Sequence, residues 1–111
     1  MMATMTASAE EIAWAAGLFE GEGSIYPSGS GVRLALKMTD EEPIRRFAKI
    51  VKRGSVYGPY SYERWSDGHK RKPFWTWVCY DRAEAGVTIE RLAPWLSSRR
   101  LNRAHELGIY P

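Results

Sequence analysis

The pattern of hydrophobic and polar positions divides the chain into helices and strands. Residues 9–21 have a helical period, and Ser8 followed by Glu11 predicts a capping box at the start of that helix. The pattern then changes to strand-like alternation over residues 23–26 and again over residues 32–39, with proline, serine and glycine between them. These two segments therefore predict a β-hairpin.

The same two patterns repeat downstream. The further predicted elements are a helix from residue 40 to Gly54, strands over 55–62 and 74–80, a helix over 83–96 and a short helix over 99–104. The order αββαββα(α) predicts an α+β fold, with a four-stranded antiparallel sheet and helices on one face. We expect residues 1–8 to be disordered and residues 9–111 to form a single domain.

Alternation also assigns the strand residues to the two faces of the sheet. In the second strand, Leu34 and Leu36 fall on the inner face, while Arg33 and Lys37 fall on the outer face. The outer face of the hairpin is polar, basic and free of acids. Such a surface suits contact with DNA, and a merely solvated face would have the same pattern.

One face of the first helix has almost no side chains. Gly17 and Gly21 lie four positions apart, and Ala13 and Ala16 join them on that face. Each glycine costs a helix roughly 1 kcal/mol relative to alanine, so the pair indicates that another backbone approaches closely. We therefore expect another segment of backbone, outside the core of this domain, to pack against this face.

Two carboxylates stand where the first helix ends. Glu20 and Glu22 lie in its last turn, just before Gly23 and the first strand. The helix dipole disfavours negative charge at a C-terminus, so this position needs a functional or structural explanation.

Composition adds bounds on size and partners. At 111 residues the chain is short for an enzyme that acts alone, so oligomerisation is expected. All 16 Lys and Arg residues lie after position 23, whereas four of the 13 acids lie before it. This basic excess suits a polyanion, although a high isoelectric point is also common in proteins that bind no nucleic acid.

The sequence shows no sign of export or of a metal cluster. No apolar run is long enough to span a membrane, and no signal-peptide pattern is present. We expect an intracellular protein, cytoplasmic or nucleoid-associated, or organellar in a eukaryotic host. Cys79 has no second cysteine, and with His69 and His105 it does not give a zinc-ligand spacing.

Residues 15–23, Ala-Ala-Gly-Leu-Phe-Glu-Gly-Glu-Gly, resemble the LAGLIDADG motif that names a family of homing endonucleases. Residues 32–39, 77–82 and 92–104 look like later landmarks of that family. The resemblance implies that the motif helices of two domains pack together. A chain with one motif would then act as a homodimer, whose interface residues would be Ala13, Ala16, Gly17, Glu20 and Gly21.

The resemblance also implies a chemistry. Glu22 matches the acid that binds a divalent metal, normally Mg²⁺ and alternatively Mn²⁺ or Ca²⁺, together with the carbonyl of Gly21. The implied activity is cleavage of both strands of a near-palindromic DNA duplex with 3′ overhangs. Glu20 would support the helix junction and is a second candidate for the metal. Such a protein is encoded in an intron, in an intein or by a free-standing gene, and the sequence does not distinguish these three origins.

Two further catalytic positions are implied. Asp40, at the end of the second strand, matches a residue that positions solvent, and its alternative role is to cap the next helix. Arg82 is the nearest match to a basic residue beside the scissile phosphate, where it would stabilise charge. The expected DNA contacts lie on the outer sheet face and the loop before the fourth strand: Ser24, Tyr26, Ser28, Arg33, Lys37, Ser55, Tyr57, Lys70, Arg71, Lys72 and Thr76.

The match departs from the family pattern at two positions. Glu22 replaces the usual aspartate, which lengthens the arm by one methylene, and Ala15 replaces a larger residue. The alternatives are therefore a non-catalytic binder on the same fold, either an RNA maturase or a DNA-binding regulator, and an unrelated α+β domain whose glycine-rich helix only dimerises.

Overall fold

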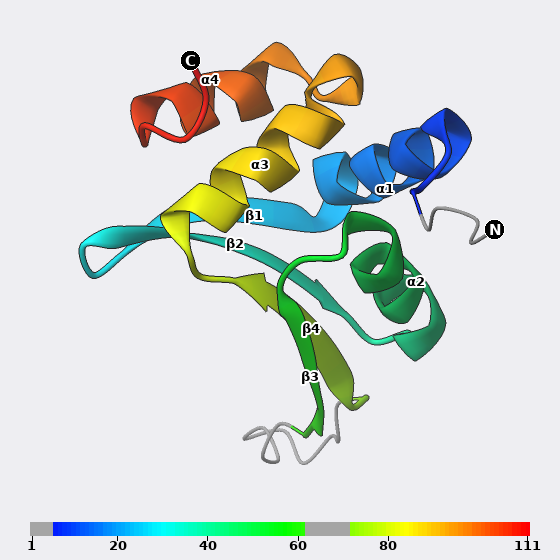
Figure 1. Ribbon diagram of the computed structural model, residues 1–111. Coiled ribbons are helices and arrows are strands. Elements are labelled where there is room, and N and C mark those ends of the chain that lie inside the picture. The colour runs from blue at the N-terminus through cyan, green and yellow to red at the C-terminus, as the bar shows by residue number, and fades with distance from the viewer. Residues whose placement is uncertain (1–5, 62–71) are drawn as a thin grey trace, which may run out of the picture.

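The computed structural model describes residues 6–61 and 72–111, which form an α+β domain (Figure 1). Its elements are α1 (Ala9–Glu22), β1 (Gly23–Ser28), β2 (Gly31–Met38), α2 (Glu41–Val51), β3 (Ser55–Tyr60), β4 (Phe74–Cys79), α3 (Arg82–Leu92), the 3-10 turn η1 (Ala93–Trp95) and α4 (Ser98–Glu106). The predicted order of elements is confirmed.

Two boundaries differ from the prediction. The helix expected over residues 83–96 ends at Leu92, because Pro94 cannot donate a helical hydrogen bond and the chain continues as η1. Order also begins before residue 9. Ala7 packs against the core, and Ser8 forms the predicted capping box with Glu11.

The four strands form one antiparallel sheet in the order β1-β2-β4-β3. The outer strands β1 and β3 contain Pro27 and Pro59, which lack the N–H group that a central strand would need. The edge position of both strands follows from this chemistry.

The core lies between the sheet and the helices, all of which cover one face (Figure 1). Leu34 and Leu36 point into it as the alternation predicted, and both are fully buried. Phe47 of α2 stacks on Phe19 of α1 and meets Trp77 of β4 edge to face, with ring centroids 6.3 and 4.8 Å apart. This aromatic cluster joins α1, α2 and the sheet.

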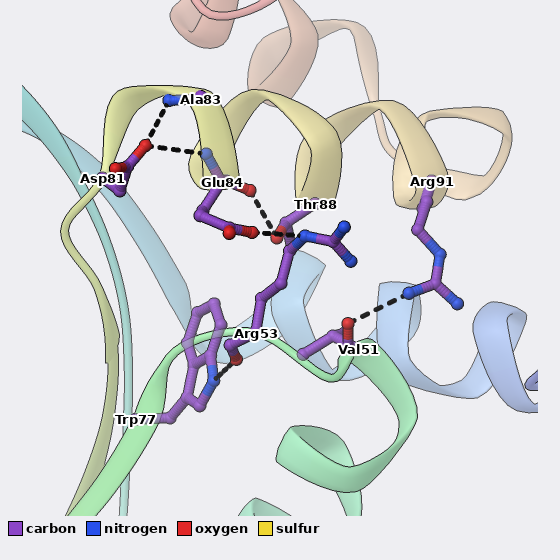
Figure 2. Close-up of polar contacts among 8 residues, drawn as sticks. All are labelled: Val51, Arg53, Trp77, Asp81, Ala83, Glu84, Thr88 and Arg91. Atoms are coloured by element: carbon purple, nitrogen blue, oxygen red, sulfur yellow. Dashed lines mark hydrogen bonds and ion pairs between the residues drawn. The ribbon is translucent and has the colours of Figure 1, made fainter. Parts of the chain in front are cut away.

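Polar contacts join the turn after α2 to the sheet and to α3 (Figure 2). The indole N–H of Trp77 donates to the Arg53 carbonyl at 2.7 Å, and the Arg53 side chain forms an ion pair with Glu84. Arg91 donates to the Val51 carbonyl at 3.0 Å. These contacts fix α2 and α3 relative to each other above the sheet.

Trp77→Phe is expected to destabilise the protein by about 2–3 kcal/mol, because it leaves a cavity and removes the donor to the Arg53 carbonyl. Urea denaturation followed by circular dichroism measures this. Trp95→Phe at an exposed position is the matched control, with an expected change below about 0.5 kcal/mol. Equal effects of the two substitutions would contradict the prediction.

Candidate functional site

Glu22 is the last residue of α1, at the junction with β1. The junction is tight because Gly23 is buried, and a Cβ added to it would lie 2.5 Å from the Phe19 ring. The Glu22 side chain is exposed, and no described residue forms a hydrogen bond or ion pair with its carboxylate. This carboxylate is therefore available to a ligand.

The predicted small-residue face of α1 is open at its two glycines. Gly17 and Gly21 are exposed, and a Cβ added to either would have no described atom within 4 Å apart from its own helix backbone. Ala13 is half-buried. The interface role predicted for Ala16 needs a correction. Ala16 is fully buried in the core of its own domain and cannot reach a partner helix. The exposed part of the predicted interface is thus centred on the glycines.

Glu20 joins the end of α1 to the start of α4. Its carboxylate accepts hydrogen bonds from the backbone N–H and the hydroxyl of Ser97, both at 2.8 Å, and Arg99 lies 3.8 Å away. In return, Arg100 donates to the Glu20 carbonyl at 2.9 Å. The supporting role predicted for Glu20 agrees with this geometry, and the junction holds the helix turn that carries Glu22.

The pKa of Glu20 is lowered below its ordinary value of 4.5, chiefly by the hydrogen bond from the Ser97 backbone N–H. The Ser97 hydroxyl and the positive charges of Arg100 and Arg99 lower the pKa further, and burial opposes the shift to a smaller extent than the backbone hydrogen bond. A lowered pKa in the folded state stabilises the protein above pH 4.5. This contribution is lost as the pH falls through the folded-state pKa.

Glu20→Gln is therefore expected to lower the free energy of unfolding by about 1 kcal/mol at pH 7, because the charged acceptor is lost. The difference from wild type should shrink as the pH falls below 4.5. Urea denaturation at pH 7 and pH 3 measures both values. Glu90→Gln on the exposed side of α3 is the control, and a Glu20→Gln effect that is independent of pH would contradict the prediction.

Three arginines of α4 surround the start of β1, a feature that sequence reasoning missed. Arg99, Arg100 and Arg103 line a groove of about 350 Å³ together with Ser24, Ile25 and Glu106. Arg103 donates to the Ile25 carbonyl at 3.3 Å. The Arg-Arg-Leu-Asn-Arg sequence was the available signal, but only the packing of α4 places it next to the residues that follow Glu22.

No described hydrogen bond or ion pair joins Asp40 or Arg82 to Glu22. Asp40 is exposed at the N-cap position of α2, yet its side chain makes no capping hydrogen bond. Arg82 donates to the Leu107 carbonyl at 2.8 Å, at the other end of α4 from Ser97. This placement does not favour Arg82 as the phosphate-binding residue, and both roles stay predictions.

The open sheet face carries most of the predicted DNA contacts. Cross-strand pairs bring Tyr26 beside Arg33, and Lys37 beside Thr76, which in turn pairs with Tyr57. Ser24 and Ser55 are exposed, Ser28 is half-buried, and Lys72 is exposed just before β4. Lys70 and Arg71 lie outside the described residues. The predicted contact residues that the structure describes thus form one polar and basic surface, which begins next to Glu22.

None of the helices in the described part of the chain has the length and apolar character needed to cross a membrane. No protein-family model and no curated protein matches the sequence.

Two solved structures of the homing endonuclease I-CvuI have a similar fold. The first, in complex with its target in the presence of Ca²⁺, matches with a TM-score of 0.65 and 20% identity. The second, with the I-CreI target and Mg²⁺ and with DNA not cleaved, matches with a TM-score of 0.59 and 19% identity. Each match covers 88% of this chain and 64% of the I-CvuI chain, so the chain spans less than two thirds of that protein. The four-stranded α+β fold expected from the order of the elements is therefore confirmed, and it is similar to the fold of the homing endonuclease I-CvuI.

Proposed function

We propose that the chain is a site-specific double-stranded DNA endonuclease that acts as a homodimer with a divalent metal ion. The observation that carries the proposal is the placement of Glu22. It is an exposed carboxylate without a partner among the described residues, at the end of a helix with an open glycine face and beside a basic sheet face.

DNA is the proposed substrate because the uncovered face of the sheet is rich in groups that bind nucleic acid. Arginine, lysine, serine, threonine and tyrosine side chains lie there in register, and helices cover only the opposite face (Figure 1). Such groups supply both phosphate contacts and base contacts. The DNA complexes of I-CvuI, whose fold is similar, support this choice.

A homodimer is proposed because one chain offers only part of a metal site. No group of three or more His, Cys, Asp or Glu side chains in the described residues could hold an ion. A second copy packed through Gly17 and Gly21 would bring a second Glu22 close to the first. Two carboxylates and two Gly21 carbonyls are hard oxygen ligands that suit Mg²⁺.

The metal, when bound, would supply Lewis acidity for attack of water on the phosphodiester. This chain's own residues would position the helix end that carries Glu22 and neutralise the phosphate oxygens of the DNA. Glu20, held by Ser97, fixes the direction of the helix end, while Arg99 and Arg103 would neutralise phosphate oxygens next to Ser24. Arginine keeps its proton at neutral pH, so these side chains stabilise charge and do not transfer protons.

Incubation of the full chain with a randomised duplex library and Mg²⁺ tests the proposal. Cleavage of a limited set of near-palindromic sites, with short 3′ overhangs found by end sequencing, is the expected result. Omission of the metal should abolish it. Failure to cleave any duplex at micromolar protein would overturn the nuclease assignment.

A second candidate is a non-catalytic nucleic-acid binder, either an RNA maturase or a DNA-binding regulator. The observation that favours it is that Arg82, the residue expected beside the scissile phosphate, donates instead to the Leu107 carbonyl. In the library experiment this candidate predicts retention of specific sequences without Mg²⁺-dependent cleavage, so the same assay separates the two functions.

A further inference from the structure

Arg33 is held between two tyrosines on the open sheet face. Tyr26 lies opposite Arg33 in the β1–β2 pair, and its hydroxyl accepts a hydrogen bond from Arg33 Nη1 at 3.5 Å. Tyr80 follows directly after β4, where Cys79 pairs with Leu34, the neighbour of Arg33. The guanidinium carbon of Arg33 lies 4.3 Å from the Tyr80 ring centroid and 5.8 Å from that of Tyr26.

These contacts restrict which atoms of Arg33 a ligand can reach. Arg33 Nε is buried and has no hydrogen-bond partner in the described chain, whereas the side chain as a whole is only half-buried. The ligand-facing part is therefore the terminal pair Nη1 and Nη2. The hydrogen bond to Tyr26 raises the pKa of Arg33 against a smaller opposing effect of burial, so the group is a permanent cation.

The surroundings of this cation lack an acid. No described carboxylate forms an ion pair with Arg33, although Arg53, another half-buried arginine, pairs with Glu84. A planar cation that is fixed by aromatic rings presents two parallel N–H groups in one orientation. That arrangement matches the O6 and N7 acceptors of guanine in the major groove, which arginine reads with two hydrogen bonds.

We infer that Arg33 is a specificity-determining residue that reads one guanine per half-site, and that Tyr80 is the positioning residue that holds its guanidinium. This inference rests on the proposed DNA binding and goes beyond it by naming a base and two residues. Tyr80 was not among the contacts predicted from the sequence. A phosphate contact is the rival role for Arg33, and it would carry no base preference.

The test is selection of bound duplexes from a randomised library without divalent metal, with the wild type and four variants. Wild type should enrich guanine at one position in each half-site. Arg33→Lys should lower the preference for guanine at that position by roughly 10- to 100-fold and leave other positions unchanged. Tyr80→Leu should lower it by roughly 3- to 10-fold, whereas Tyr80→Phe, which keeps the ring, should retain it.

Arg45→Lys on the exposed side of α2 is the matched control and should select the wild-type site. A uniform loss of affinity in Arg33→Lys, with no change at any one position, would assign Arg33 to a phosphate and overturn the inference. An effect of Tyr80→Leu equal at all positions would overturn the role of Tyr80. If the wild type retains no duplex at all, the proposed function fails, and the inference fails with it; retention of duplexes without guanine at the Arg33-dependent position contradicts the inference alone.

Discussion

Glu22→Gln is expected to lower the rate of Mg²⁺-dependent DNA cleavage by roughly 10²- to 10³-fold while DNA binding stays nearly unchanged. The amide keeps the shape of the side chain and loses the negative charge that would hold the metal. Because the carboxylate has no partner among the described residues, its replacement removes no internal contact. Single-turnover cleavage of a selected site measures the rate, and a metal-free binding titration measures the affinity.

Glu10→Gln is the matched control for this experiment. It removes a carboxylate from the same helix at an exposed position in the first turn, far along α1 from the sheet junction. Its cleavage rate should equal that of the wild type. Wild-type cleavage by Glu22→Gln would show that the metal position has been assigned to the wrong residue, and Glu20 would then be tested in the same way.

Gly17→Leu is expected to convert the proposed homodimer to a monomer and so to remove the proposed cleavage activity. A leucine side chain would keep the two motif helices apart, since close approach is what a glycine face permits. The single chain has room for the larger side chain, because an added Cβ at Gly17 meets no described atom within 4 Å outside the local helix backbone. Leucine also favours the helix over glycine by roughly 1 kcal/mol.

Light scattering at micromolar concentration measures the oligomeric state, and circular dichroism confirms that the helices remain. Ala9→Leu, at the exposed first residue of α1, is the control and should stay dimeric. A wild-type chain that is monomeric both alone and with DNA would contradict the interface. So would a Gly17→Leu variant that remains dimeric.

The local pattern of the chain determined a large part of this structure. Periodicity identified the elements and assigned Leu34 and Arg33 to opposite faces of the sheet, because a period of two residues fixes the side of each side chain. The change of period after Gly21 placed Glu22 at a helix end. The four-residue spacing of Gly17 and Gly21 also placed both glycines on one face of α1, because the face that a helical residue occupies depends on spacing alone.

Contacts between distant segments were decided only by the tertiary structure. Ser97 and Arg100 reach Glu20 across 77 and 80 residues, and no local pattern encodes such a pairing. The strand order placed the Tyr80 ring over Arg33. The packing of α4 brought its arginines next to β1, and Arg82 donates a hydrogen bond to the Leu107 carbonyl. Hydrophobic spacing thus determined which face each residue occupies. Register and helix packing, which depend on the whole chain, determined which residues meet.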